Sequence, residues 1–207
     1  MIELKNVYKK FGENVVLNNI NVKFTKNNIY GLIGRNGSGK TMILNTICGF
    51  VKPTSGEVII NNVNIYKNNT FPKNTRALIE GPKFLNNLTG YENLELLASI
   101  NNKVGKKEIE KVLKEVNLFE EKDKIYSKYS LGMKQKLGIA QVLMENPDIL
   151  IFDEPFNGLD EQSATKIRKI LLKQKEMGKI IIIATHIKED IEQLCNKIYK
   201  IDAGKLN

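Results

Sequence analysis

Eight consecutive residues are the clearest candidates for chemistry in this chain. They match the pattern G-x-x-x-x-G-K-[ST] and are Gly34, Arg35, Asn36, Gly37, Ser38, Gly39, Lys40 and Thr41. Glycines in this pattern let backbone N–H groups close around phosphate oxygens, and the helix that follows adds the positive end of its dipole. We expect the Lys40 ammonium to reach the β- and γ-phosphates of a nucleoside triphosphate and the Thr41 hydroxyl to bind Mg²⁺.

The segments on either side of this loop support a nucleotide-binding function. Apolar residues from Ile29 to Ile33 precede the loop and predict a strand, and residues from Met42 to Cys48 predict a helix. Met42 therefore joins the loop residues in the expected nucleotide-binding set. The alternative is a glycine-rich turn that contains Gly-Lys-Thr by chance, but a strand, a loop and a helix in this order are the context that the pattern requires.

A pair of acidic residues follows another apolar segment. Residues 149–152 are continuously apolar and predict a buried strand that ends in Asp153 and Glu154. Because α/β proteins bind ligands at the carboxyl ends of their strands, both carboxylates are candidates for the second half of the nucleotide site. Asp153 can hold Mg²⁺ through water, and Glu154 can polarise the water that attacks the γ-phosphate. A solvent-exposed acidic turn before Pro155 is the weaker alternative, given the apolar run and the phosphate loop.

The elements that must position these residues form an α/β pattern. Short apolar segments alternate with helical patterns, which predicts a largely parallel sheet. The predicted strands are residues 2–7, 21–24, 28–33, 56–60, 149–152, 180–184 and 198–201. A helical lobe of about residues 84–145 interrupts them, and Thr89 and Glu92 form the expected capping box of one of its helices. We expect a single domain, residues 1–207, with this lobe inserted.

Hydropathy and charge restrict the remaining functions. The longest purely apolar segment, residues 180–184, is far shorter than the roughly 20 residues that a membrane-spanning helix needs. The first residues lack the layout of a secretory signal, so we expect a cytoplasmic protein without direct membrane insertion. The net charge of +9 is spread over lysines interrupted by acidic residues, as in segments 103–114 and 122–128, which we expect to be solvated helix faces. Nucleic acid is therefore not an expected partner, whereas an anionic membrane surface fits this charge.

A third motif lies just before the acidic strand, where residues 129–135 are Tyr-Ser-Leu-Gly-Met-Lys-Gln. This segment resembles the signature of ABC transporter ATPases, which is usually Leu-Ser-Gly-Gly-Gln. Ser130 and Gly132 match its serine and second glycine, whereas its leucine, first glycine and glutamine are replaced. Ser130 can cap the helix that follows and present the free amides of that helix to a phosphate. Taken alone, the segment is better explained as a helix cap without a ligand.

Three further positions resemble motifs of the same family. Phe11 resembles the aromatic residue that stacks on adenine, Asp160 ends a segment similar to the D-loop, and His186 resembles the switch histidine at the γ-phosphate. The alternatives are a core aromatic for Phe11 and a surface residue for His186, the only histidine. The resemblance covers essentially the whole chain. It implies a P-loop NTPase (RecA-like) core with a mostly parallel sheet, an N-terminal antiparallel β part, an inserted helical subdomain, and ATP and Mg²⁺ as cofactors.

Glu80 departs from the common pattern of the family. Most ABC ATPases carry a glutamine between the sheet and the helical lobe, where it touches Mg²⁺ and the attacking water and senses the membrane partner. The matching segment here, residues 76–82, has Glu80 instead. Together with residues 87–94 and 129–135, this feature resembles the bacitracin and lantibiotic exporter or self-immunity branch. We expect Glu80 to face the metal or its water shell; the alternative is a surface carboxylate in a Gly-Pro loop.

The resemblance also implies a mechanism and its partners. Two such modules, identical or homologous, dimerise head to tail, with each ATP between the phosphate loop of one and the Ser130 segment of the other. Closing and opening of this dimer drive a membrane-spanning subunit, so the chain is expected at the cytoplasmic face of the cell membrane. The expected function is to power export of a peptide antibiotic or immunity to one.

Other functions remain open at this point. Export of another substrate, such as a drug, a lipid or a polysaccharide, would use the same motifs. A chromosome-maintenance ABC ATPase would need a long coiled coil between Thr41 and Ser130, and this span is too short and lacks sustained heptads. A ribosome-associated factor would carry two such domains. A P-loop kinase of small metabolites gives no role to Ser130 or His186, and phosphotransfer to a small acceptor would distinguish it from an ATPase.

Overall fold

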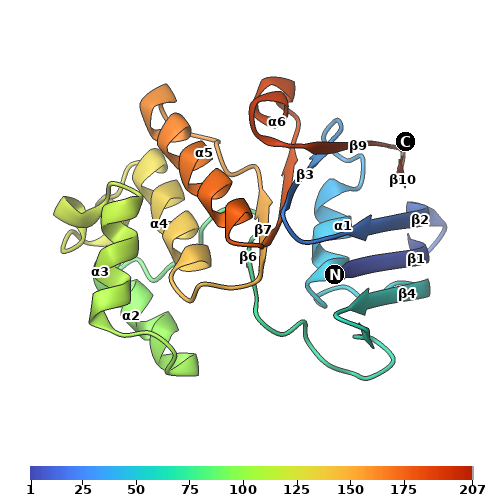
Figure 1. The fold of residues 1–207 in the computed structure, drawn as a ribbon, viewed down its shortest axis with the longest axis horizontal. Helices are drawn as coiled ribbons and strands as arrows, with labels where there is room; N and C mark the ends of the chain where they lie inside the picture. Colours follow the sequence, from blue (N-terminus) through green and yellow to red (C-terminus); the bar gives the residue numbers. More distant parts are fainter. Residues whose placement is uncertain (207) are drawn as a thin grey trace.

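The computed structural model describes residues 1–206 of the chain. Its strands form an antiparallel sheet at one end of the molecule and a mixed sheet in the middle, and a group of helices lies at the other end (Figure 1). The mixed sheet is the part that positions the predicted site.

The antiparallel sheet comes from the first part of the chain. In spatial order its strands are β2 (Asn14–Phe24), β1 (Ile2–Phe11), β4 (Ser55–Ile60) and β5 (Val63–Asn64). Leu4 and Val58 pair across β1 and β4, and both are buried in a core shared with the mixed sheet. Polar residues alternate with such apolar ones, as expected of an antiparallel sheet with one face packed against a core.

The mixed sheet brings several loops to one edge. In spatial order it contains β10 (Lys205–Leu206), β9 (Lys197–Asp202), β3 (Asn28–Ile33), β8 (Ile180–Thr185), β7 (Ile149–Asp153) and β6 (Thr75–Leu78). Within the described residues all neighbouring strands are parallel except β10 and β9. Ile33 pairs with Thr185 and Asp153 pairs with Ala184, so β3, β7 and β8 end at the same edge. The loops that leave these strands therefore meet there.

Helices and the antiparallel sheet cover the two faces of the mixed sheet. The helices are α1 (Lys40–Ile47), α2 (Gly90–Asn101), α3 (Lys106–Glu115), α4 (Leu131–Leu143), α5 (Glu161–Glu176) and α6 (Lys188–Leu194), with the 3₁₀ turns η1 (Phe119–Glu121) and η2 (Tyr126–Lys128). Ile180 and Ile182 share a core with α1 and the antiparallel sheet, whereas Ile181 and Ile183 share a core with α4 and α5. Burial on both sides explains why β8 is apolar from Ile180 to Ala184. No helix in residues 1–206 has the length and apolar character needed to cross a membrane.

The predicted strands are all present, and β1 and β2 are longer than their patterns indicate. β6 escapes prediction because it is a four-residue edge strand in which only Leu78 is buried. The capping box is confirmed: Thr89 Oγ1 accepts a hydrogen bond from the Glu92 amide, and the Glu92 carboxylate accepts one from the Thr89 amide. Between β6 and β7 the chain holds α2, α3 and α4, together with η1 and η2.

The prediction of a solvated helix face at residues 122–128 is wrong. These residues run from the end of η1 through η2. The Tyr126 amide donates a hydrogen bond to the Leu88 carbonyl at 2.8 Å, and Ile125 forms an isolated bridge with Thr89. Contacts with a distant segment therefore replace the helical hydrogen bonds that the local charge pattern led us to expect.

Candidate functional site

The phosphate loop of the sequence pattern, Gly34–Thr41, connects β3 to α1. α1 begins at Lys40, two residues earlier than predicted, so the end of the motif is itself helical. Gly39 caps this helix with φ +110°, and a Cβ there would lie 3.1 Å from the Val16 carbonyl oxygen. A side chain at this position would therefore be strained and crowded. The first amide groups of α1 point along the loop without a side-chain cap, which leaves them available to an anion.

Lys40 is tied to its own loop. Its side chain is buried, and Nζ donates hydrogen bonds to the carbonyl oxygens of Gly34 at 2.7 Å and Arg35 at 3.2 Å. Ser38 Oγ is buried beside it without a hydrogen-bond partner among the described residues. An unsatisfied buried hydroxyl costs free energy, which a phosphate oxygen accepting its hydrogen bond would recover. The loop thus fits a polyphosphate, because both polar groups gain stronger partners when one binds.

Asp153 is the last residue of β7 and faces the loop. Its Oδ2 accepts a hydrogen bond from Thr41 Oγ1 at 2.7 Å. Burial raises the pKa of the Asp153 carboxyl, and the charges of Glu154 and Glu80 raise it further, whereas the Thr41 hydrogen bond and the Lys40 charge lower it. A bound cation would favour the ionised form.

The Thr41 and Asp153 oxygens fit Mg²⁺, a hard cation that prefers oxygen ligands. The described residues contain no cluster of three His, Cys, Asp or Glu side chains that could hold a metal ion. Mg²⁺ would therefore need further ligands from nucleotide phosphates and water, as is usual for Mg²⁺ at nucleotide sites.

Glu154 follows Asp153 and is held by the loop after β8. Its Oε2 accepts a hydrogen bond from Thr185 Oγ1 at 2.7 Å, and its Oε1 lies 2.8 Å from His186 Nδ1. The His186 amide also donates to Oε1 at 3.1 Å. Glu154 has φ +50°, in the left-handed region that a non-glycine residue rarely adopts. Three hydrogen bonds therefore fix a carboxylate on a strained backbone, an arrangement often found at functional sites.

These residues surround two adjoining hollows. One, of about 290 Å³, is lined by Lys40, Thr41, Met42 and both carboxylates among others, and the second, of about 440 Å³, lies between the loop and His186. Asn36 lines both hollows, and Arg35 lines the second. We call Gly34–Met42, Asp153, Glu154 and His186 together the carboxyl edge. The structure brings all of these predicted residues to one place.

Ser130, Gly132 and Asp160 lie on the helical side of the mixed sheet instead. Ser130 caps α4, where its Oγ accepts a hydrogen bond from the Met133 amide at 3.2 Å, so the predicted cap is confirmed. Asp160 caps α5 and accepts a hydrogen bond from the Ser163 amide at 2.7 Å. A Cβ on Gly132 would lie 2.8 Å from the Gly158 carbonyl oxygen. The start of α4 therefore packs against the turn that leads to α5, and these residues form a separate group.

Phe11 and Glu80 are exposed. Phe11 ends β1 with 53% of its surface accessible, and Lys9 Nζ lies 4.6 Å from its ring centroid. Glu80 has φ +57°, and its carboxylate lies 3.5 Å from Lys83 Nζ. The Glu80 side chain thus pairs within its own loop, although its charge contributes to the raised pKa of Asp153. The roles predicted for Phe11 and Glu80 stay predictions.

One contact of the site escapes prediction from the sequence. Gln135 is buried on α4, and its Nε2 donates hydrogen bonds to the carbonyl oxygens of Glu154 at 3.1 Å and Pro155 at 2.9 Å. It thereby ties the helix that Ser130 caps to the backbone that carries the Glu154 carboxylate. Its only signal in the sequence is an amide side chain at a helix position where apolar neighbours predict a core.

Comparisons with known sequences agree with this geometry. A family model described as ABC transporter matches residues 17–157. The bacitracin transport ATP-binding protein BcrA of Enterococcus faecalis is 44% identical over 209 residues, which cover 100% of this chain and 68% of BcrA. The lantibiotic transport ATP-binding protein SrtF of Streptococcus pyogenes is 34% identical over 206 residues, which cover 100% of this chain and 89% of SrtF.

Solved structures share the fold. The ATP-binding subunit of an ABC transporter matches with a TM-score of 0.90 and 27% identity, covering 100% of this chain and 88% of the other. A dimeric post-hydrolysis state of the cassette MJ0796, bound to ADP and Pi, matches with a TM-score of 0.88 and 28% identity, covering 100% of this chain and 97% of the other. These likenesses confirm the predicted fold class, with its antiparallel N-terminal sheet and mostly parallel mixed sheet.

Proposed function

This chain belongs to the ABC transporter family as an ATP-hydrolysing subunit, and from this premise we propose that ATP bound at its carboxyl edge powers export of a peptide antibiotic or immunity to one. The carboxyl edge carries the ATP-dependent part of this proposal, because three separate segments bring a phosphate loop, a cation-binding oxygen pair and a fixed carboxylate together there.

Nucleotide binding exchanges contacts within the loop for contacts with phosphate. Lys40 leaves the Gly34 and Arg35 carbonyls for the β- and γ-phosphates, and the loop amides and Ser38 Oγ donate to the remaining oxygens. Thr41 and Asp153 would hold Mg²⁺, which when bound neutralises phosphate charge. Phe11 supports the adenine ring at the exposed end of β1.

Hydrolysis then depends on Glu154. A water oxygen forms a bond to the γ-phosphorus as the bond to the ADP oxygen breaks, and Glu154 accepts a proton from that water. Thr185 and His186 hold the Glu154 carboxylate, so its position is set before the nucleotide arrives. His186 lines the hollow beside the phosphate loop, and we propose that it contacts the γ-phosphate.

A second cassette completes the site. Ser130, Gly132 and Asp160 form a group apart from the carboxyl edge, which supports our proposal that they meet the nucleotide of a partner rather than their own. We infer a head-to-tail dimer, with itself or a homologous subunit, that ATP holds together; the MJ0796 cassette, a similar fold, is dimeric with ADP and Pi bound. Nucleic acid is not a partner in this mechanism.

A membrane-spanning subunit is the second partner. It would dock beside Glu80 at the cytoplasmic face of the membrane, and Glu80 would exchange its Lys83 contact for the metal or its water shell when the site closes. The peptide-antibiotic assignment rests on the Glu80 segment and on the similarity to BcrA and SrtF, whose names state bacitracin and lantibiotic transport.

Co-expression tests the proposed substrate. The chain would be produced with the membrane subunit that co-purifies with it, in a host sensitive to bacitracin and lantibiotics, and growth would be measured against each antibiotic. We expect resistance with the parent chain and none with Glu154→Gln at equal protein level. If the membrane complex hydrolyses ATP but the host stays equally sensitive to both compounds, the ATPase exports another substrate.

A further inference from the structure

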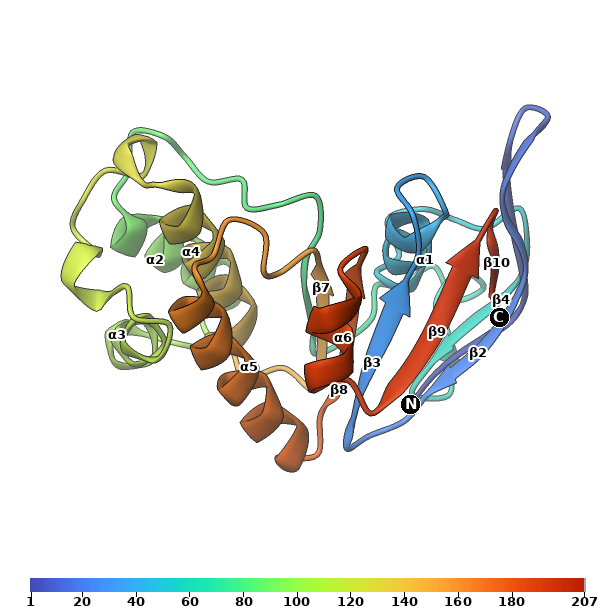
Figure 2. The ribbon, with the colours of Figure 1, turned by 90° about the horizontal axis from the view of Figure 1, so that it is seen from above.

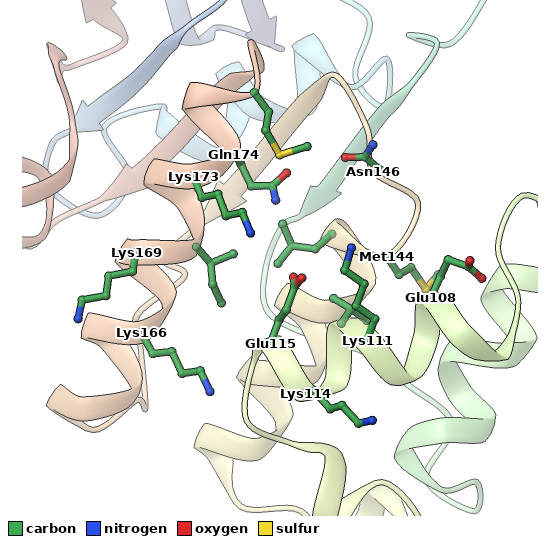
Figure 3. Close-up of a pocket in the computed structure, with 14 residues that line it drawn as sticks. Glu108, Lys111, Lys114, Glu115, Met144, Asn146, Lys166, Lys169, Lys173 and Gln174 are labelled. Atoms are coloured by element: carbon green, nitrogen blue, oxygen red, sulfur yellow. The ribbon is translucent and has the colours of Figure 1, made fainter.

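A groove lined with lysines lies between α3 and α5, away from the residues assigned to ATP. Its volume is about 810 Å³, and Figure 3 shows lysines on both of its walls. The lysines are Lys111 and Lys114 on α3 and Lys166, Lys169 and Lys173 on α5. We call this feature the lysine groove.

The charge of the groove is largely uncompensated. None of its five lysines forms an ion pair with another residue in the described part of the chain. The two acidic residues of the groove are Glu108, whose carboxylate accepts a hydrogen bond from the Gly105 amide, and Glu115. Lysines three or four positions apart on one helix repel each other, so these rows do not stabilise their helices. An anionic partner would remove that repulsion.

The floor of the groove is apolar. Val112, Leu143, Met144, Ile170 and Met177 line it between the two rows of lysines. Met177, at the end of α5, is 55% exposed. The groove therefore offers apolar contact along its centre and positive charge along both sides.

The lysine groove and the carboxyl edge lie at opposite ends of the parallel strands. Asn146 and Met177 precede β7 and β8, whereas Asp153 and Glu154 lie where β7 ends. In Figure 2 β3 points toward the loop before α1, the end of α5 lies at the opposite end of the strands, and α3 lies to the left of α5. Buried Lys179 donates hydrogen bonds to Asn146 and Gln174, which fixes this end of the groove.

The groove continues along α5. A second hollow of about 520 Å³ shares Lys166 and Lys169 with it and extends to Glu161 at the start of the helix. α5 has 16 residues, and a rise of about 1.5 Å per residue makes it roughly 24 Å long. The two hollows together therefore extend along α5 far enough to hold several turns of another helix.

We propose that the lysine groove binds an acidic amphipathic helix of a partner protein. Apolar side chains at positions i, i+3, i+4 and i+7 of that helix would lie on the Ile170 and Met144 floor. Asp and Glu on its flanks would pair with the lysine rows of α3 and α5. A bilayer is a poorer fit, because lipid headgroups form a broad surface whereas these lysines line a concavity with an apolar floor.

A designed peptide tests this proposal. The probe is a fluorescent helical peptide of about four turns with leucine along one face and glutamate on both flanks. Its control has the same composition in scrambled order. Fluorescence anisotropy with the full chain should show at least a tenfold preference for the helical peptide. Lys166→Glu/Lys169→Glu should weaken its binding at least tenfold.

Matched controls separate a groove from general charge attraction. Lys67→Glu/Lys73→Glu changes the net charge equally on exposed residues between β5 and β6, and should bind the peptide as the parent does. Both double variants should keep the parent circular dichroism spectrum and ATPase rate. Equal binding of the scrambled peptide, or equal loss in both double variants, would overturn the proposal. Binding of anionic phospholipid vesicles that requires Lys166 and Lys169, without peptide binding, would overturn it in favour of lipid.

Discussion

The carboxyl edge and the lysine groove differ in the contacts that their charged side chains make. At the carboxyl edge Lys40 binds loop carbonyls, Asp153 accepts from Thr41, and Glu154 is held by the loop after β8. In the groove, the lysines have no ion-pair partner among residues 1–206. A ligand must displace hydrogen bonds in the first region, whereas in the second the described contact of a lysine head group is that of Lys114 Nζ, 4.5 Å from the Phe119 ring centroid.

This difference sets what each region can recognise. Exchange of contacts at the carboxyl edge favours ligands that offer better partners than the protein does, which for Lys40 means phosphate oxygens. The geometry there is fixed by hydrogen bonds in advance, as catalysis requires. In the groove the charges are solvated, so attraction should be weaker and strongly reduced by salt. Four substitutions test this contrast, and the one with the largest expected effect changes Lys40.

Lys40→Ala should separate the two regions most clearly. It deletes a buried ammonium that we propose contacts the β- and γ-phosphates, and we expect ATP affinity to fall roughly 100-fold, about 2.7 kcal/mol. Titration with a fluorescent ATP analogue measures this change. Lys169→Ala is the control from the lysine groove and should bind ATP as the parent does. If both variants lost the same ATP affinity, Lys40 would have no special role in nucleotide binding.

Gln135→Leu should affect turnover more than binding. The leucine cannot donate to the Glu154 and Pro155 carbonyls, so the Glu154 backbone loses its tie to α4. We expect kcat for ATP to fall about tenfold while ATP affinity changes less than twofold. The unsatisfied carbonyls should also lower the free energy of unfolding by about 1–3 kcal/mol. If Gln135 is only structural, the folded fraction of the variant will keep the parent kcat.

Glu80→Ala should have a smaller effect, visible with the membrane subunit present. The exposed carboxylate pairs with Lys83 in the isolated chain, so its removal should leave ATP affinity unchanged. We expect partner-stimulated ATPase and antibiotic protection to fall several-fold, and Glu80→Gln to be milder because its amide oxygen still reaches metal or water. Parent behaviour of Glu80→Ala in ATPase and growth assays would make Glu80 a solvated loop residue.

Lys169→Gln should give the smallest change, an increase in stability. Lys169 lies three positions after Lys166 and four before Lys173, so neutralising it removes repulsion on both sides. We expect the free energy of unfolding in low-salt urea titrations to rise by about 0.3 kcal/mol. The gain should vanish at high salt, where the charges are screened. A loss of stability would mean that Lys169 has a favourable partner.

Local patterns explain which parts of the site the sequence could predict. The phosphate loop lies between a strand and a helix, and Asp153 and Glu154 follow a strand buried on both faces, so glycine spacing and apolar runs are enough to place them. The likeness to ABC motifs added His186, which the structure joins to Glu154.

Other features depend on contacts between distant segments. The Gln135 hydrogen bonds require α4 to pack beside β7, and no local pattern records that distance. The lysine groove appears only when α3 and α5 face each other, since each helix alone carries an ordinary solvated face. Among the described non-glycine residues, positive φ angles occur at asparagines except at Glu80, Glu154 and Ala203. Two of these three exceptions are predicted site carboxylates, and their strain could not be deduced from residue type.

We propose that ATP hydrolysis at the carboxyl edge depends on Glu154, which accepts the proton of the attacking water. The most direct test is to measure ATP binding and ATP hydrolysis with Mg²⁺ on the same purified Glu154→Gln sample, beside the parent chain. The account predicts ATP affinity within about threefold of the parent and hydrolysis reduced by roughly 100-fold or more, because the amide cannot accept that proton. It also predicts an ATP-dependent dimer of the variant. Hydrolysis at the parent rate by the folded variant would contradict the account.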